Sequence, residues 1–478
     1  MSAVAKLLLA QGVRVSGSDM QENEQTKILE ERGARITIGH AAGNVPSDAE
    51  IVIHTSAAPE SNPEREEARR RGVPEMTNFR FLAEWFKDAK ILLVAGTHGK
   101  STTTAMLGLL LDKAGLDPTL IVGSKVPGFA DGNLRLASWN MEHGTWNMES
   151  SIFVIEGDEY AKHFLEFRPY GAIINNIELD HTDIYPTLED YVSAFAEMLG
   201  KIQDRGMVVA NVGEEQVAAL LESKADDLRQ RQVRIFGFVD SRGLIRTNKR
   251  IVEEAWTVSH ERKNGFTELT LTKGAVTYRF VLRVHGSHNA MNAAGAALMA
   301  LQLGAPYHEV AQALESFSGI WRRFESLGEI NGAQVYSDYG HHPTAVSSTL
   351  VTAKELFPQS RLVLCFQPHH RNRTKSLFAD FVPSFDLADV LLLCEIYDVA
   401  GRDASADADI SSQDLVEAVK RQDAERNVER VVEYAPDPAS AIGRLKALLE
   451  PGDTAIIMGA GDIDDEGRKW LSSRAKPR

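Results

Sequence analysis

The stretch Val94–Met106, VAGTHGKSTTTAM, constrains the fold of this chain more than any other feature. An apolar run, Lys90–Ala95, leads into two glycines and a lysine, and a segment with helical apolar spacing runs from Ser101 to Gly115. This pattern predicts a buried strand, a tight turn and a helix whose free backbone N–H groups face an anion. We therefore expect a phosphate-binding loop, although the common GxxxxGK[ST] motif would have glycine at the position of Val94.

The side chains of this loop indicate its chemistry. Lys100 is expected to neutralise phosphate charge, and the hydroxyl of Ser101 is expected to ligate Mg²⁺. The alternative is a glycine-containing loop with a chance Lys-Ser pair, which the preceding strand and the following helix argue against. The sequence therefore predicts a nucleotide-binding loop.

Strand and helix patterns alternate along nearly the whole chain, which is typical of parallel sheets covered by helices. Strand signals at Val13–Asp19 and Ile51–Ser56, with a helical stretch at Asn78–Ala89, form a first segment. A new strand–helix series begins after Gly319–Phe324. In 478 residues we expect three α/β domains, with boundaries placed to within several residues: 1–88, 89–322 and 323–478.

Composition argues against several classes of protein. The formal net charge of −15 disfavours a nucleic-acid partner. The two cysteines, Cys365 and Cys394, lie in apolar runs typical of buried strands, so we expect neither a disulfide nor a zinc–cysteine site. Because no apolar segment reaches membrane-spanning length and no basic-then-apolar leader is seen, we expect a cytoplasmic protein without membrane contact.

Carboxylates follow a predicted strand in the stretch Ser151–Tyr160, SIFVIEGDEY, which contains Glu156, Asp158 and Glu159. Binding sites of α/β proteins lie at the carboxyl ends of the strands, and carboxylates there suit Mg²⁺. On this motif alone, carboxylates on a solvated turn remain the alternative.

The stretch AIINNIELDHTD runs from an apolar strand directly into Asn176, Asp180, His181 and Asp183. A histidine here can be structural, but beside a phosphate loop and a carboxylate cluster we predict that His181 is a metal ligand. Imidazole is an unusual ligand for Mg²⁺, which prefers oxygen, so a second metal or a water-bridged contact stays open.

Polar stretches further along the chain extend the candidate site. The sequence HGSHNAMN opens an alanine-rich helix in which Asn289 and Asn292 are expected to share one face. Their amides can bond adenine or phosphate, although asparagine is also common as a helix cap. The loops SDYGHHPT (Ser337–Thr344) and FQPHHRNRT (Phe366–Thr374) concentrate histidine and arginine, which suits a carboxylate-bearing substrate.

Together these motifs resemble those of the Mur ligases, ATP-dependent amide-forming enzymes of peptidoglycan precursor synthesis. GTHGKS, IEGDEY, NNIELDH, HNAMN, WRRF, DYGHHPT, FQPHHRNRT and MGAGDI occur in the order found in that family. The resemblance implies an N-terminal Rossmann-like domain for a UDP-substrate, a central P-loop ATPase-like domain and a C-terminal Rossmann-like domain for an amino acid. It also implies that ATP converts a substrate carboxylate into an acyl phosphate, from which an incoming amine displaces phosphate.

The resemblance further implies roles for individual residues. Lys100, Glu156 and His181 are expected to be catalytic, Lys100 by stabilising the transferring phosphoryl group, and Ser101, Glu156 and His181 to surround Mg²⁺. The residues expected to bind ATP are Gly96, Thr97, His98, Gly99, Lys100, Ser101, Thr102, Asn289, Asn292, Arg323 and Asp338. The residues expected to bind the other substrates are Ser18, Asp19, His54, Thr55, Ser56, His341, His369 and Arg373, the last three near the amino acid.

Two departures from the family pattern concern the substrates. The GxGGxGMS loop, which holds the diphosphate of the uridine nucleotide in relatives, is missing because the chain begins at its Met-Ser. We therefore expect a first sheet without its first strand and weak binding of UDP-N-acetylmuramate. In addition, His370 stands where the alanine-adding branch carries arginine, although Arg371 follows.

The identity of the amine substrate stays open between two branches of the family. DYGHHPT, FQPH and GAGDI are similar to the branch that adds L-alanine to UDP-N-acetylmuramate. That branch also lacks the carbamylated lysine that several relatives have. The corresponding segment of this chain, Tyr191–Leu199, contains no lysine either. DEY and NNIELDH are similar instead to the branch that attaches the recycled tripeptide L-alanyl-γ-D-glutamyl-meso-diaminopimelate.

Two functions from other classes are disfavoured. A phosphate-loop GTPase would need a guanine-reading NKxD-like motif, which the sequence lacks. A nucleotide-binding protein without catalysis is disfavoured because every residue that the ATP half requires is present. We expect a monomer or homodimer, and we assign no role to Trp139 and Trp146, which lie in what reads as an insertion before the acidic cluster.

Overall fold

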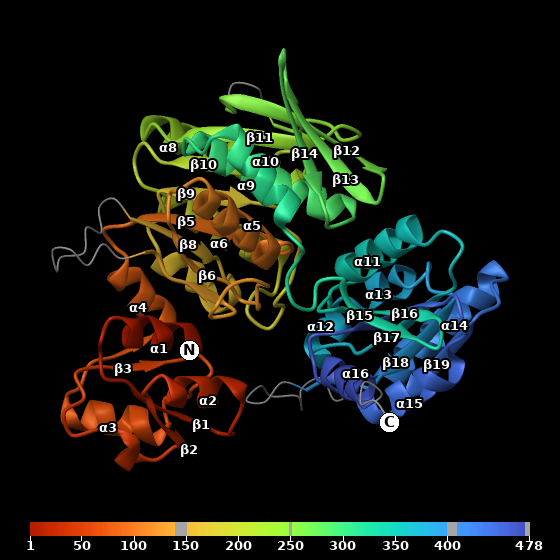
Figure 1. The fold of residues 1–478 in the computed structure, drawn as a ribbon, viewed down its shortest axis with the longest axis horizontal. Helices are drawn as coiled ribbons and strands as arrows, with labels where there is room; N and C mark the ends of the chain where they lie inside the picture. The colour runs from red at the N-terminus through yellow and green to blue at the C-terminus, as the bar shows by residue number, and fades with distance from the viewer. Residues whose placement is uncertain (139–150, 248–250, 399–408, 474–478) are drawn as a thin grey trace.

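The computed structural model describes residues 1–138, 151–247, 251–398 and 409–473, so Trp139 and Trp146 lie outside the described residues. Three α/β regions follow one another along the chain, with the first region below the central one and the C-terminal region to their right in Figure 1. None of the helices within the described ranges combines the length and apolar character needed to span a bilayer.

The first region contains two separate pairs of parallel strands instead of one continuous sheet. β1 (Ser16–Asp19) pairs with β2 (Arg35–Ile38), and β3 (Val52–His54) pairs with β4 (Glu75–Thr77). The helical elements of this region are α1 (Ser2–Ala10), α2 (Glu24–Glu31), η1 (Ala42–Asn44), α3 (Pro63–Arg71) and α4 (Asn78–Trp85). Among the described residues β1 and β3 are not paired with each other, so each is an edge strand on one side.

The central region is built on a ten-stranded sheet in the order β14-β13-β12-β11-β10-β9-β5-β8-β6-β7. Its strands are β5 (Lys90–Ala95), β6 (Thr119–Ile121), β7 (Leu134–Arg135), β8 (Ile152–Glu156), β9 (Gly171–Ile174), β10 (Met207–Asn211), β11 (Arg234–Asp240), β12 (Glu254–Lys263), β13 (Phe266–Lys273) and β14 (Val276–Leu282). β12, β13 and β14 form an antiparallel extension. The prediction of alternating strands and helices is therefore wrong for this stretch, in which buried and exposed residues largely alternate along β12 and β13.

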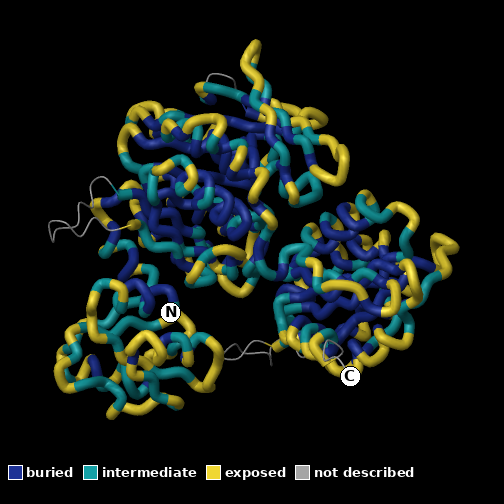
Figure 2. The backbone as a smooth tube through the Cα atoms, in the orientation of Figure 1, coloured by how far each residue is buried: buried dark blue, intermediate teal, exposed yellow. Residues whose placement is uncertain are grey.

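Two hydrophobic cores cover the two faces of the central sheet, and buried backbone fills this region in Figure 2. On one face pack α5 (Lys100–Lys113), α9 (Ser287–Gln302) and α10 (Tyr307–Ser316). On the other face pack η4 (Tyr160–Glu166), α6 (Leu188–Gly200), α7 (Glu215–Ser223) and α8 (Ala225–Gln230). Val4 and Leu7 of α1 and Phe81 of α4 join this second core, which anchors the first region to the central one.

The C-terminal region has a six-stranded sheet in the order β15-β16-β20-β17-β18-β19, in which only β15 pairs antiparallel. Its strands are β15 (Glu325–Ile330), β16 (Ala333–Asp338), β17 (Leu362–Phe366), β18 (Val390–Cys394), β19 (Val431–Ala435) and β20 (Thr454–Met458). Its helices are α11 (Pro343–Leu356), α12 (Arg371–Ser376), α13 (Phe378–Ser384), α14 (Ser412–Arg426), α15 (Pro438–Leu448) and α16 (Ile463–Ser472). Cys365 and Cys394 are buried in the neighbouring strands β17 and β18, as predicted.

The loop between β6 and β7 contacts the first region, the carboxylate cluster of the central region and the segment that leads into the C-terminal region. The ammonium of Lys125 lies 2.5 Å from a carboxylate oxygen of Glu24 in α2. The backbone N–H of Trp321, just before the C-terminal region, donates to the carbonyl of Lys125 at 2.9 Å. The N–H of Gly123 donates to Glu156 Oε2 at 2.8 Å, so the loop also reaches the carboxylate cluster.

Candidate active site

The predicted strand–turn–helix is present, because β5 ends at Ala95 and α5 begins at Lys100. Gly96 has φ +138° and Gly99 has φ +81°, conformations that residues with a Cβ resist. A Cβ on Gly99 would lie 2.2 Å from Oδ1 of Asn292 in α9. Glycine is therefore required at position 99 by the space available as well as by the backbone.

Lys100 is held inside the loop. Its ammonium donates to the carbonyls of Gly96 at 2.7 Å and Thr97 at 3.1 Å, and to Glu159 Oε1 at 2.9 Å. Burial alone would lower the pKa of Lys100, but the carboxylates of Glu159 and Glu156 outweigh burial and raise it. Because a lysine has three donors, a phosphate must replace at least one of these acceptors.

Glu159 joins Lys100 to His181, although the sequence did not single it out within its acidic cluster. The carboxylate is nearly fully buried, and Nε2 of His181 lies 3.3 Å from Glu159 Oε1. Burial would raise the pKa of Glu159, but Lys100 and His181 lower it, so this carboxyl stays ionised. Among the described residues, Glu159 Oε2 and His181 Nδ1 are buried without a hydrogen-bond partner.

The residues expected around Mg²⁺ fall into two neighbouring pairs. Ser101 Oγ donates to Glu156 Oε1 at 2.9 Å, which places two oxygen donors beside the phosphate loop. His181 contacts Glu159 and Asp180 instead. Oxygen donors are what Mg²⁺ prefers, so Ser101 and Glu156 fit this ion.

Replacing Glu156 with glutamine is expected to raise the Mg²⁺ concentration needed for half-maximal ATP turnover by at least about tenfold, because loss of supporting groups alone costs that much at metal sites. Titration of Mg²⁺ at saturating ATP measures the change. Glu166→Gln, in the exposed part of η4, is the matched control. An unchanged Mg²⁺ requirement in the Glu156 variant would show that this carboxylate is structural.

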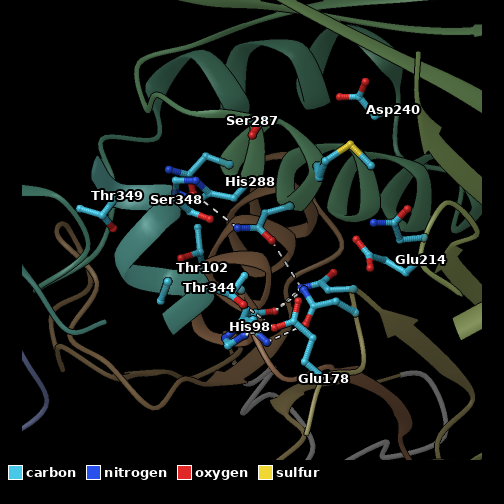
Figure 3. A pocket seen from close by; sticks show the side chains of 18 of the residues that line it. His98, Thr102, Glu178, Glu214, Asp240, Ser287, His288, Thr344, Ser348 and Thr349 are labelled. Atoms are coloured by element: carbon cyan, nitrogen blue, oxygen red, sulfur yellow. Dashed lines mark hydrogen bonds and ion pairs between the residues drawn. The ribbon is translucent and has the colours of Figure 1, made fainter. Parts of the chain in front are cut away.

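A cavity of about 300 Å³ lies beside the phosphate loop, where the central and C-terminal regions meet (Figure 3). The predicted ATP-binding residues that line it are His98, Gly99, Thr102, Asn289, Asn292, Arg323 and Asp338. Gly96, Thr97, Lys100 and Ser101 belong to the adjoining loop and do not line it. Residues from segments more than 200 positions apart therefore surround one space.

Several lining residues were missed from the sequence. They are Asn175, Glu178, Asn211, Glu214, Phe238, Asp240, Arg242, Ser287, His288, Met291, Thr344, Ala345, Ser348 and Thr349, whereas Asn176, which was noted from the sequence without a role, also lines the cavity. Asn175, Glu178 and Thr344 lie within motifs already noted, so their position beside predicted residues was a usable signal. Asp240 is the last residue of β11 and Arg242 follows it, in a stretch without any motif.

Side-chain amides form a chain along the start of α9. Asn292 Nδ2 donates to Asn289 Oδ1 at 3.4 Å, which confirms that these residues share a face. Asn175 Nδ2 donates to Asn292 Oδ1 at 3.4 Å. Burial, reinforced by Arg323, lowers the pKa of His288 to about 4, so this cavity residue is neutral at pH 7. The cavity floor is therefore polar but uncharged along α9.

The C-terminal region contributes a buried carboxylate and an arginine to the cavity. Asp338 accepts the backbone N–H groups of Phe324 at 2.8 Å and Gly340 at 2.7 Å. Burial raises the pKa of Asp338, although Arg323 opposes that shift. The guanidinium of Arg323 lies 5.3 Å from the centre of the Tyr339 ring, which fixes its orientation.

The residues expected near the amino acid lie together. The rings of His341 and His369 are 5.7 Å apart, and Arg373 Nη1 donates to the carbonyl of His369 at 3.2 Å. Arg373 Nε also donates to Asp180 Oδ1 at 2.7 Å, and both side chains are about 5% exposed. Arg373 therefore faces a protein carboxylate that sequence reasoning did not pair with it.

The five residues expected to bind the uridine nucleotide lie at the carboxyl ends of β1 and β3. Ser18 Oγ donates to Glu64 Oε2 at 2.8 Å and lies 2.8 Å from His40 Nδ1. Within the described chain, none of the five lines the cavity beside the phosphate loop. The two groups of predicted substrate residues are therefore on different regions.

A phosphate loop on a central sheet, buried carboxylates around its lysine and a third α/β region docked over its cavity define a nucleotide-dependent enzyme of three α/β parts. The chain belongs to the Mur ligase family. The family's catalytic domain matches residues 1–90, its middle domain residues 94–300 and its glutamate ligase domain residues 322–461. The predicted family and three-domain α/β architecture are confirmed.

Similar proteins with named activities narrow the class of reaction. UDP-N-acetylmuramate–L-alanine ligase of Solidesulfovibrio magneticus is 34% identical over 99% of this chain and 95% of its own length. The alanine ligase of Thermotoga maritima has a TM-score of 0.75 at 26% identity, covering 99% of this chain and 96% of its own. A murein peptide ligase of Psychrobacter arcticus, 23% identical over 100% and 97% of the two chains, shares the fold with a TM-score of 0.68. The protein is thus an ATP-dependent, amide-forming ligase of peptidoglycan precursor synthesis.

Proposed function

We propose that this chain joins L-alanine to UDP-N-acetylmuramate and converts ATP to ADP and phosphate. The supporting observation is the similarity to alanine ligases over 99% of the chain, which includes the cavity and the cluster around Arg373. The alternative amine is the tripeptide L-alanyl-γ-D-glutamyl-meso-diaminopimelate. A ligase for that tripeptide from Neisseria meningitides is 25% identical to this chain and covers 67% of it.

We assign the phosphate-binding half of the reaction to the loop between β5 and α5. Its backbone N–H groups and Lys100 face the phosphates of ATP, and Lys100 leaves one of its protein acceptors to neutralise the transferring group. Ser101 and Glu156 would hold Mg²⁺, with His181 beside them, and the ion would offset phosphate charge when bound. Asn289, Asn292, Arg323 and Asp338 surround the rest of the nucleotide.

We assign the amine to the cluster of His341, His369 and Arg373. His341 Nδ1 donates to the carbonyl of Tyr339 at 3.1 Å, which leaves Nε2 as an acceptor. Burial, reinforced by Arg373, lowers the pKa of His341, so its ring is neutral at pH 7 and can accept a hydrogen bond from an ammonium group. Asp180 holds Arg373 in place and limits how far its guanidinium can reach toward a substrate carboxylate.

We further propose the division into a UDP-substrate domain (1–88), an ATP domain (89–322) and an amino-acid domain (323–478). In this division, UDP-N-acetylmuramate contacts the ends of β1 and β3 and extends its carboxylate toward the phosphate loop. The amine approaches from the C-terminal side, so attack occurs between the two regions. Phosphate then leaves toward the cavity that held ATP.

The test is an amine panel. The full chain is incubated with Mg²⁺, ATP and UDP-N-acetylmuramate, and with L-alanine, glycine, L-serine or the tripeptide, while ADP and the ligated product are measured. L-Alanine is expected to give the highest kcat/KM by at least about tenfold, the discrimination that a pocket fitted to one methyl group can reach. Preference for the tripeptide would contradict alanine ligation and support tripeptide ligation. ADP release without any ligated product would contradict both functions.

A further inference from the structure

Two histidines and a glutamate converge where the phosphate loop meets the C-terminal region. His98 belongs to the phosphate loop, Glu178 follows β9, and His342 precedes α11. One donor atom from each residue lies within 4.8 Å of the other two. In the ranges that the structure describes, no second group of three potential metal ligands meets this spacing.

The donor set is that of a transition metal. His98 Nε2 lies 3.2 Å from Glu178 Oε2, and His342 Nδ1 lies 3.8 Å from the same oxygen. Figure 3 shows His98 and Glu178 together at the lower edge of the cavity, with Thr344 beside them. Two imidazoles and one carboxylate are the protein ligands of a class of zinc sites that keep one position open, whereas Mg²⁺ prefers oxygen throughout.

Neighbouring groups orient these ligands as they do at metal sites. His342 Nε2 donates to the carbonyl of Leu179 at 3.4 Å, so Nδ1 carries the one lone pair of the ring. That lone pair accepts the backbone N–H of Thr344 at 3.3 Å, and a cation on Nδ1 would replace this bond. The hydroxyl of Thr344 donates to Glu178 Oε2 at 2.7 Å. Such partners fix the tautomer of a ligating histidine and the direction of a ligating carboxylate.

We propose that His98, Glu178 and His342 form a binding site for a zinc-class divalent cation that bridges the phosphate loop and the C-terminal region. His98, Glu178 and Thr344 line the cavity beside the phosphate loop, so the open coordination position faces that cavity. The site uses none of the residues assigned to Mg²⁺. The proposal does not depend on which amine is the substrate.

The position of this site predicts its effect on the enzyme. Because His342 comes from the C-terminal region, the ligand set is complete only when the two regions are docked. A bound cation therefore stabilises the docked arrangement and slows the opening through which products leave. Zinc bound here is a brake on turnover, distinct from the Mg²⁺ that the reaction requires.

The experiment uses Co²⁺ as a spectroscopic probe for zinc-class sites. The full chain, free of nucleotide at neutral pH, is titrated with Co²⁺ while visible absorption is recorded, and Zn²⁺ is then added. We expect one equivalent of Co²⁺ to give a saturable absorption band that Zn²⁺ removes. His342→Ala and Glu178→Gln should abolish the one-equivalent step, and Thr344→Val, which keeps every ligand, should weaken binding by about tenfold.

Two variants serve as controls, and circular dichroism checks the fold of every protein. His308→Ala removes a histidine that is 70% exposed on α10, and His181→Ala alters the residue assigned to Mg²⁺; both should keep the band. Absence of the band in the parent chain would overturn the proposal. So would an unchanged band in folded His342→Ala and Glu178→Gln, or a band lost only in His181→Ala.

Discussion

Replacing Lys100 with alanine is expected to lower the rate of ATP-dependent ligation by at least about 100-fold, since in the proposed mechanism Lys100 neutralises the phosphoryl group in transfer. A second effect adds to the first. Glu159, nearly fully buried, would keep His181 as a partner but lose Lys100, and a buried carboxylate without its cation is costly. Measurement of kcat with saturating ATP and Mg²⁺ separates the loss of chemistry from weaker binding.

Two further variants show which effect dominates. Lys113→Ala lies on the exposed end of the same helix and should leave kcat unchanged. In Lys100→Ala combined with Glu159→Gln, the buried charge is removed, so thermal stability should recover while the rate stays low. Near-normal ligation by folded Lys100→Ala would contradict the assignment of this loop to ATP.

Replacing Arg373 with methionine is expected to lower kcat/KM for the amine by at least about 100-fold. The Arg373–Asp180 pair is about 5% exposed on both sides and joins the C-terminal region to the central one. Removing one partner of such a pair costs about 3–5 kcal/mol, because the other charge stays buried. Here the two regions can separate, which exposes Asp180 to water. The loss of Arg373 is therefore expected to weaken docking of the C-terminal region more than it lowers the free energy of unfolding.

Solution scattering with an ATP analogue measures this docking directly. Arg373→Met should raise the radius of gyration, and Asp180→Asn combined with Arg373→Met should bring it back toward the parent value without restoring ligation. Arg421→Met, which removes an exposed arginine of α14, is the control for loss of a positive charge. A parent-like radius together with parent-like kcat/KM in Arg373→Met would show that the pair contributes to neither step.

The elements with strong local signals were predicted well. β5 has the predicted bounds, and the glycines of the phosphate loop form the predicted turn with positive φ angles. These features depend on neighbouring residues, because a buried strand, a turn and a helix start each leave a pattern a few residues long. The same applies to the shared face of Asn289 and Asn292.

The missed features depend on residues far apart in the chain. Asp180 and Arg373 are separated by 193 positions, and Thr344 lies 166 positions from Glu178, to which it donates. No local pattern specifies such contacts, so the sequence predicted a substrate near Arg373 but did not predict its protein partner Asp180. The antiparallel strands β12 to β14 were missed because their half-exposed surface lacks the continuous apolar runs on which the parallel strands were recognised.

The β6–β7 loop determines which parts of this ligase can be exchanged with those of its relatives. Lys125 of the loop forms an ion pair with Glu24, and the N–H of Gly123 donates to Glu156. The carbonyl of Lys125 accepts the N–H of Trp321. A chimaera that receives a foreign first domain but keeps this loop would join mismatched surfaces next to the loop that bonds Glu156. The natural unit for recombination is therefore discontinuous: the N-terminal residues together with the β6–β7 loop, transplanted as one piece.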